Sequence, residues 1–243
     1  MERNISYKSH NISYILTYKQ VKNINLRIKP DGIVYVSAPR GVGVDVIDHF
    51  VLSKGEVILS YISKIKERQE KRERQAEKQY ISGEKFLFLG DKLELKLIVS
   101  TEDSVRMDSK FLYLYCKNPY DKRKKERLIT RWFQEQTQVV FEEIMKKVYE
   151  QFKQYNIDYP QLKIRKMSTK WGVCRPRACI ITLNSYMIQA KKECIEYVVI
   201  HEFCHFIHPN HSKNFYSLME SFIPDWKEKK QLLEESVEFN TIF

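Results

Sequence analysis

The sequence lacks any long run of apolar residues. Nowhere do about 18 such residues follow one another, so we expect no membrane-spanning helix. The start of the chain also lacks the apolar core of a secretory signal peptide, because Met1-Glu2-Arg3-Asn4 leads directly into alternating, strand-like sequence. These absences predict a cytoplasmic protein without a membrane partner. No internal repeat and no flexible Gly/Ser linker is evident.

Cysteine is sparse as well. The chain has five cysteines at irregular spacing, and the odd number suits reduced thiols better than a disulfide framework. Cys174 and Cys179 flank a short basic segment, but no second pair is spaced to complete a metal site with them. We therefore expect a hairpin with two buried thiols there rather than a second metal site.

The residues that are present indicate a folded, basic protein. Of the 243 residues, 43% are hydrophobic, which allows a sizeable core in one domain or in two small ones. The formal net charge is +11, and a basic excess attracts anionic partners, of which nucleic acid is the commonest. Part of the excess lies in residues 122–127, which can equally be a solubilising helix start. Nucleic acid is therefore one candidate partner on the basis of charge. No helix-turn-helix, zinc-finger or RNA-binding signature accompanies the charge.

Hydropathy along the chain follows two periods, and together they indicate an α+β fold. A period of two residues predicts strands over 11–38, 85–116, 162–167 and 178–184. A helical period predicts helices over 44–78 (with a break near Gly55), 120–155, 192–208, 212–222 and 225–237. We place a domain boundary near residue 118. It separates an antiparallel β-rich N-terminal domain (1–118), crossed by a helix, from a C-terminal domain (119–243) of helices and a small sheet.

Four of the six histidines lie in the segment 201–211. His201-Glu202-Phe203-Cys204-His205 has the H-E-x-x-H pattern of zinc peptidases. Positions i and i+4 lie on one face of a helix, so the two imidazoles can bind a single ion. Glu202 is turned roughly 100° from His201 and can reach a metal-bound water. The flanking apolar residues predict a buried helix, where Glu and His are rare unless paired or bound to a metal.

A catalytic zinc ion usually has three protein ligands and one open position. Pro209 predicts that the helix ends near His208, because proline disfavours helical geometry in the residue before it. After the turn, His211 can point back toward the ion, and it is our preferred third ligand. His208 is the competing candidate, since on an unbroken helix it would lie near the same face. Cys204 points elsewhere and is expected to be a small buried residue.

At this point a resemblance becomes specific. The segment from Ile164 to Leu233 resembles the YgjP-like metallopeptidase family, a group of zincins related to SprT-like and WLM proteases. The matching residues are Lys170-Trp171-Gly172-Val173-Cys174, Ile181-Thr182-Leu183-Asn184, Glu196 to Glu202, Asn210-His211-Ser212, Phe215 and Pro224-Asp225. The N-terminal part is similar to the family at Pro30-Asp31-Gly32, Ala38-Pro39 and Gly83 to Gly90. The departures are Phe203 for a leucine, Tyr216 where tryptophan is common, and Val173 and Arg175 for two serines.

The resemblance implies a zincin-like C-terminal domain in which His201, His205 and His211 bind one Zn²⁺ and Glu202 is the general base. It also implies a peptide or protein substrate that pairs with the strand near Ile180–Asn184. Asn184 and Tyr216 are candidate substrate-binding residues, with structural roles as the alternative. Two other functions remain open. One is a protease acting on DNA-bound proteins, as in the related families, and the other is a metal-bound scaffold without catalysis.

Overall fold

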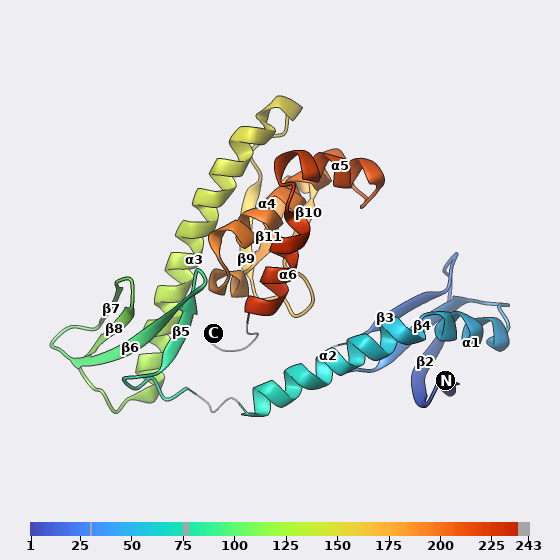
Figure 1. Cartoon of the computed structure of the whole chain (residues 1–243), viewed down its shortest axis with the longest axis horizontal. Coiled ribbons are helices and arrows are strands. Elements are labelled where there is room, and N and C mark those ends of the chain that lie inside the picture. Colours follow the sequence, from blue (N-terminus) through green and yellow to red (C-terminus); the bar gives the residue numbers. More distant parts are fainter. Residues whose placement is uncertain (30, 75–77, 238–243) are drawn as a thin grey trace. The chain divides into compact units, whose positions relative to one another are not determined.

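A computed structural model of the chain describes residues 1–29, 31–74 and 78–237. The chain divides into two compact units, Met1–Glu77 and Lys78–Phe243 (Figure 1). This division differs from the predicted boundary near 118, because residues 78–118 pack with the C-terminal part of the chain. Within the described residues, no helix is both long and apolar enough to span a membrane.

The first unit is a four-stranded sheet followed by two helices. Its elements are β1 (Glu2–Tyr7), β2 (His10–Lys19), β3 (Asn25–Ile28), β4 (Val34–Pro39), α1 (Val44–Ser53) and α2 (Gly55–Arg74). The strand order is β1-β2-β4-β3, and the central pair β2–β4 is parallel. The prediction of a purely antiparallel sheet was therefore wrong. Alternating hydropathy identifies strands but not their order, and here β4 lies between β2 and β3.

The predicted helix break at Gly55 is confirmed, since α1 ends at Ser53 and α2 begins at Gly55. A Cβ atom on Gly55 would lie 2.5 Å from the Tyr7 ring, so this close approach of the helix to β1 requires glycine. The predicted extension of the helix to Lys78 falls partly on residues 75–77, and the predicted turn at 30–32 includes residue 30. These residues lie outside the described part of the chain.

The second unit begins with another four-stranded sheet. Its strands are β5 (Lys85–Phe88), β6 (Asp91–Val99), β7 (Ser104–Met107) and β8 (Phe111–Cys116). The order is β5-β6-β8-β7, with β6–β8 parallel and the outer pairs antiparallel. Strand order and pairing senses are thus the same as in the first sheet. The sequence shows no repeat, so this repeated topology is visible only in the structure.

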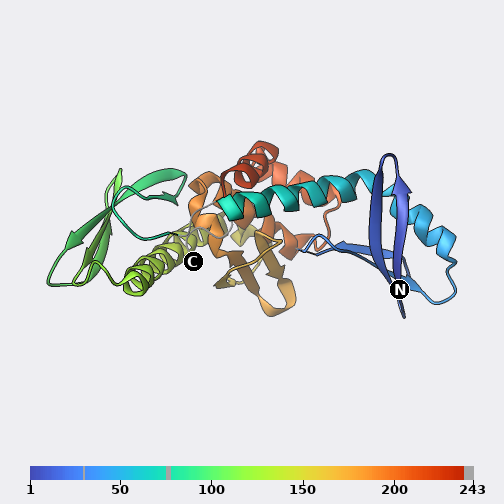
Figure 2. The same ribbon diagram turned by 90° about the horizontal axis from the view of Figure 1, so that it is seen from below.

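This sheet packs against the N-terminal part of the long helix α3 (Lys122–Phe152) (Figure 2). The Phe86 ring lies 6.2 Å from that of Phe133, and the Phe88 ring 5.4 Å from that of Trp132. The β5–β6 turn, Leu89-Gly90, donates its amides to the carbonyls of Ile188 and Gln189 at 2.8 and 2.9 Å. These contacts explain why residues 78–118 belong to the C-terminal unit.

The remaining elements surround a small three-stranded sheet. They are η1 (Lys153–Tyr155), β9 (Gln161–Arg165), β10 (Gly172–Arg175), η2 (Pro176–Ala178), β11 (Ile180–Asn184), η3 (Ser185–Gln189), α4 (Lys192–Ile207), α5 (Lys213–Phe222) and α6 (Trp226–Ser236). The strand order is β10-β11-β9, with β10–β11 antiparallel and β11–β9 parallel. The helices agree with the sequence prediction to within about two residues at each end, the usual uncertainty of helix boundaries.

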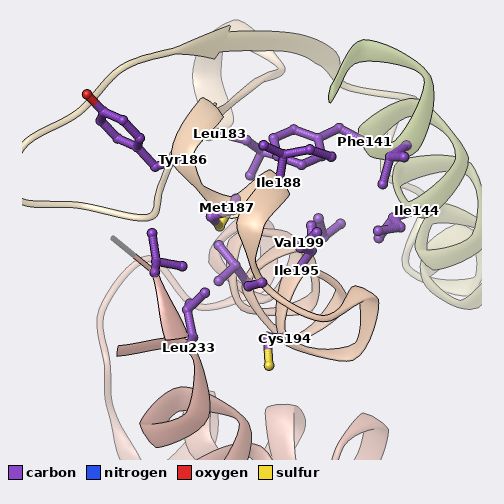
Figure 3. Close-up of a cluster of buried hydrophobic side chains, with 14 of the residues drawn as sticks. Phe141, Ile144, Leu183, Tyr186, Met187, Ile188, Cys194, Ile195, Val199 and Leu233 are labelled. Carbon is purple, nitrogen blue, oxygen red and sulfur yellow. The ribbon is translucent and has the colours of Figure 1, made fainter. Parts of the chain in front are cut away.

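The core of this unit immobilises α4, the helix that carries the H-E-x-x-H residues. Ile195 and Val199 of α4 are fully buried among side chains from α3, β11, η3 and α6 (Figure 3). Burying apolar surface stabilises by roughly 25 cal/mol per Å², and a helix packed on several sides cannot rotate without losing these contacts. The orientation of the α4 histidines is therefore set by the core.

The basic cluster 122–127 forms the first turns of α3. Asp121 caps the helix and accepts a hydrogen bond from the Lys124 amide at 3.0 Å. The Lys124 ammonium lies 2.8 Å from Asp103, and Lys125 is only 4% exposed. The cluster is a helix start, as one of the two interpretations expected, but the charges of Lys124 and Lys125 are used inside the fold rather than solvated.

Candidate metal centre

Helix α4 brings His201 and His205 to one face, and the following loop brings His211 to them. The ring centroids of His201 and His205 are 5.0 Å apart, and His211 lies 4.9 and 4.8 Å from them. One nitrogen from each ring can be chosen so that all three lie within 4.8 Å of one another. Among the described residues, this is the cluster of His, Cys, Asp and Glu side chains that could hold a metal ion.

The turn that returns His211 follows from local sequence. His208 ends α4 with extended backbone (φ −124°, ψ 99°), as expected before Pro209. Ser212 caps α5 by accepting a hydrogen bond from the Phe215 amide at 3.4 Å, so the chain between them is only a short turn. His208 is not part of the cluster. Its contribution is its carbonyl oxygen, which lies 3.3 Å from Nδ1 of His205.

The three imidazoles have the properties of a ligand set. Burial, together with the neighbouring His205 and His211, lowers the pKa of His201 to about 3, so its ring is neutral and keeps a lone pair. Its Nε2 lies 3.0 Å from Nε2 of His211, a separation compatible with two ligands of one zinc ion bound at about 2.0–2.1 Å each. When Nδ1 of His205 donates to the His208 carbonyl, its Nε2 is left to bind, the usual arrangement of a metal-bound histidine.

Phe215 forms the apolar wall of the cluster. Its ring is fully buried and lies 4.8–5.0 Å from all three histidine rings. It restricts the orientations of the imidazoles without offering a competing ligand. Nδ1 of His201 is buried and has no hydrogen-bond partner among the described residues. The arrangement thus fits three histidine ligands of one divalent cation, as the sequence predicted.

Glu202 lies beside the cluster, against strand β10. Its side chain is 4% exposed, and its carboxylate accepts a hydrogen bond from the Cys174 amide. A Cβ atom on Gly172 would lie 2.5 Å from Oε1 of Glu202, so the carboxylate occupies the space that this glycine leaves. Burial raises the pKa of Glu202 to about 7, although the Cys174 amide and the charge of Lys170 act in the opposite direction.

A cavity of about 400 Å³ opens over these groups. Its lining includes the three histidines and Glu202, and also Trp171, Pro176, Tyr197 and Val198. The last two were missed by the sequence analysis, although a signal existed. Tyr197 and Val198 precede His201 and Glu202 by four residues and therefore lie on the same helix faces.

The structure gives Asn184 and Tyr216 different surroundings from those expected. Asn184 is fully buried and does not line the cavity. Its side-chain amide forms hydrogen bonds with backbone groups of the protein. Tyr216 stacks on Trp226 at 5.3 Å and lies 6.1 Å from the His211 ring, also outside the cavity lining. Both environments match the structural roles that the sequence left as alternatives.

Two further expectations need correction. Strand β11 (Ile180–Asn184), the expected partner of a substrate strand, is central in its sheet and already paired on both sides. The free edge beside α4 belongs to β10. Cys174 lies within β10 and Cys179 directly before β11, so the predicted hairpin is present, but both thiols are half-buried rather than buried, and Cys174 lines the cavity. Cys204 is fully buried, as predicted.

The family model described as "YgjP-like, metallopeptidase domain" matches residues 22–236. The chain belongs to the YgjP-like metallopeptidase family. A comparison with curated proteins gives no match.

Two crystal structures of metallopeptidase zymogens are similar to part of the chain. Abylysin from Pyrococcus abyssi is 20% identical, with a TM-score of 0.32, over 39% of this chain and 89% of its own. Jannalysin from Methanocaldococcus jannaschii is 19% identical, with a TM-score of 0.32, over 41% of this chain and 94% of its own.

Proposed function

We propose that this metallopeptidase uses one Zn²⁺ held by His201, His205 and His211, with Glu202 as general base, to hydrolyse peptide bonds. The observation that carries the proposal is the convergence of three imidazoles within 4.8 Å beside a buried carboxylate in one cavity. Three histidine ligands leave a zinc ion an open position, which is the mark of catalytic rather than structural sites.

The chemistry divides between the ion and the protein. A zinc ion bound there would lower the pKa of water and polarise the scissile carbonyl. Glu202 takes a proton during attack and passes it to the leaving amine. Its pKa of about 7 suits both transfers near neutral pH, and the Cys174 amide fixes the carboxylate in place. The apolar wall of Phe215 and Val198 limits access of water around these groups.

The substrate strand belongs on β10 in this proposal. An extended peptide can add to an exposed sheet edge by backbone hydrogen bonds. Strand β10 is an edge strand, and its residues Gly172, Val173 and Cys174 line the cavity next to Glu202. A peptide on this edge would pass directly over the carboxylate and the histidine cluster.

The first test compares two Glu→Gln variants on the same helix. Glu202→Gln should bind zinc as the wild type does and lose about 10²–10⁴-fold in hydrolysis, since only the proton acceptor is removed. Glu196→Gln is the matched control, because Glu196 pairs with Lys147 at 2.8 Å outside the cavity. Full activity of Glu202→Gln against a peptide library would refute the mechanism. A wild type that binds zinc and cleaves nothing would favour the scaffold.

The second test identifies the third ligand by metal analysis. His211→Ala should lose most of the bound zinc, because one of three ligands is missing, whereas His208→Ala should retain it. The opposite ranking would assign the third ligand to His208. Because the same ligand set accepts other divalent ions, zinc content is compared with cobalt and nickel content in each variant.

A second candidate function is a peptidase that acts on nucleic-acid-bound proteins, and one observation favours it. Residues 19–40 of the first unit contain a single acidic residue, Asp31, and five exposed cations that form no ion pair in the described structure: Lys19, Lys22, Arg27, Lys29 and Arg40. Clustered cations of this kind bind phosphates. A salt-dependent gel shift, with proteolysis that rises when DNA is added, would separate this function from a general peptidase.

A further inference from the structure

Lys170 is a charged residue of the cavity to which the proposed mechanism gives no step of its own, apart from its effect on the pKa of Glu202. Its exposed side chain lines the cavity together with Glu202 and the histidine cluster. It forms no ion pair with any described residue. An ammonium group offers three hydrogen-bond donors and a compact charge. It is therefore available to a group that enters the cavity.

The backbone that carries Lys170 is held unusually firmly. The buried side chain of Asn184 donates hydrogen bonds to the carbonyls of Lys170 and Met167, both at 2.8 Å. Its Oδ1 accepts from the Met167 amide at 3.3 Å, and its own amide donates to the Trp171 carbonyl at 2.8 Å. One fully buried residue of the central strand β11 thus anchors both ends of the loop 167–171. The anchoring fixes the backbone of Lys170, together with that of Trp171, at the wall of the cavity.

The surroundings of Lys170 favour an anionic ligand. The other titratable groups that line the cavity are the three histidines, Glu202, Cys174 and Tyr197. Burial raises the pKa of Cys174 and of Tyr197, so both are neutral, and a bound divalent cation would add positive charge. The carboxylate of Glu202 is already held by the Cys174 amide and is 4% exposed. Trp171, Pro176 and Val198 supply apolar walls, and electrostatic attraction is stronger in such surroundings than in water.

We propose that Lys170, positioned by Asn184 through the 167–171 loop, forms a subsite for a carboxylate of the substrate. This inference rests on the proposed peptidase function and specifies its substrate class. The carboxylate has two sources, an acidic side chain close to the scissile bond or the free C-terminus of a short peptide. Lys170 determines specificity here, and Asn184 is a positioning residue.

The test uses Lys170→Gln in the full chain and two pairs of peptides. One pair differs by Glu against Gln next to the scissile bond, and the other by a free carboxylate against an amide at the C-terminus. The wild type should prefer the acidic member of one pair by about tenfold in kcat/KM, mainly through KM, as expected for a hydrogen-bonded charge pair. Lys170→Gln should abolish this preference, so that it cleaves the two members of the pair with kcat/KM values within about twofold of each other. Because the charge of Lys170 also lowers the pKa of Glu202, the two members are compared within each variant. The pair that responds identifies the source of the carboxylate.

Three further variants separate charge from position. Lys163→Gln removes an exposed lysine on β9 that does not line the cavity, and it should keep the wild-type preference. Lys170→Arg should keep most of it, because the charge remains. Asn184→Ala leaves Lys170 in place but frees the loop, so the preference should fall while the zinc content is unchanged.

A binding measurement keeps this inference separate from the proposed function. In the Glu202→Gln background, fluorescence anisotropy should show tighter binding of the acidic peptide, and Lys170→Gln should remove the difference. If the wild type cleaves no peptide, the peptidase proposal fails and this measurement alone decides about the subsite. The inference is overturned if Lys170→Gln keeps the acidic preference. A fall of kcat/KM by the same factor for the acidic and the neutral peptide is that outcome, since Lys170 would then act on Glu202 or on the reacting carbonyl rather than on a carboxylate of the substrate.

Discussion

The two four-stranded sheets have the same strand order and the same pairing senses, yet they differ in what their buried faces contact. In the first unit, the sheet β1–β4 forms a small core with α1 and α2. In the second, the sheet β5–β8 contributes to the same core as α3, α4 and α6. One topology thus serves once as a self-contained module and once as part of the scaffold of the candidate metal centre.

The polar contacts of the two sheets differ in the same way. The β5–β6 turn donates hydrogen bonds to η3, which leads into α4. In the first unit, the Asp48 carboxylate of α1 accepts hydrogen bonds from Tyr14 of β2 and Arg3 of β1, both at 2.6 Å. The first set joins a sheet to η3, the segment before α4, and the second joins a sheet to the helix α1 of its own unit. We expect damage to the two sheets to have different consequences.

The largest effect is expected from Leu114→Ala in β8. Leu114 is fully buried in the core that also contains α4, so its loss should reduce the free energy of unfolding by about 2–5 kcal/mol. All three tryptophans, Trp132, Trp171 and Trp226, belong to this unit. Urea unfolding followed by tryptophan fluorescence should therefore shift to lower urea, and zinc release should shift with it. Zinc release at an unchanged urea concentration would show that the sheet β5–β8 and helix α4 do not unfold together.

Leu16→Ala in β2 is the matched substitution in the other sheet. Leu16 is 2% exposed, and the expected loss is also about 2–5 kcal/mol, but within the first unit. Far-UV circular dichroism should record an earlier transition, while tryptophan fluorescence and zinc release stay unchanged. A coincident shift of all three signals would mean that the two units unfold together as one cooperative unit.

The comparison also separates what the sequence could predict from what it could not. The convergence of His201, His205 and His211 followed from local spacing, because i,i+4 pairs share a helix face and Pro209 ends the helix. Helix ends were predictable for the same local reason. Their proposed role as zinc ligands, and that of Glu202 as base, stays a prediction.

Features that depend on neighbours distant in sequence were not predictable. Alternation identified β8 and β11 as strands, but not that β8 pairs in parallel with β6 or that β11 lies between β9 and β10. The assignment of a substrate strand to β11 failed for this reason. Asn184 was noticed as a polar residue near the site, but its hydrogen bonds to a loop 14–17 residues earlier in the chain have no local signature.

A smaller effect is expected from Asp48→Asn, which tests the polar network found in the first sheet. Burial alone would raise the pKa of Asp48, but the hydrogen bonds from Tyr14 and Arg3 outweigh it and hold that pKa below its ordinary value of 3.8. A carboxylate with a lowered pKa stabilises the fold above its ordinary pKa, and this contribution is lost as the pH falls through the lowered one. The variant should be less stable by about 1–2 kcal/mol at neutral pH.

The pH dependence of this difference is the decisive measurement. Thermal unfolding of wild type and variant, followed by circular dichroism, should differ most above pH 3.8 and converge only as the pH falls through the lowered pKa of Asp48. A difference that stays constant down to the lowest pH would show that the network stabilises by packing alone. Tryptophan fluorescence of the second unit provides an internal reference, because that unit does not contain Asp48.

The smallest effect is expected on nucleic-acid binding, when an arginine is neutralised at equivalent positions of the two sheets. Arg27 on β3 lies opposite Tyr35 of β4, and Arg106 on β7 lies opposite Tyr113 of β8. The sequence around Arg27 is almost free of acidic residues, whereas Asp108 beside Arg106 binds the Tyr113 hydroxyl at 2.8 Å and Glu94 pairs with Lys96. If the chain contacts nucleic acid, Arg27→Gln should reduce the slope of log K against log salt by about 1, and Arg106→Gln should leave it unchanged. Equal slopes for both variants and the wild type would show that Arg27 on the first sheet does not contact nucleic acid.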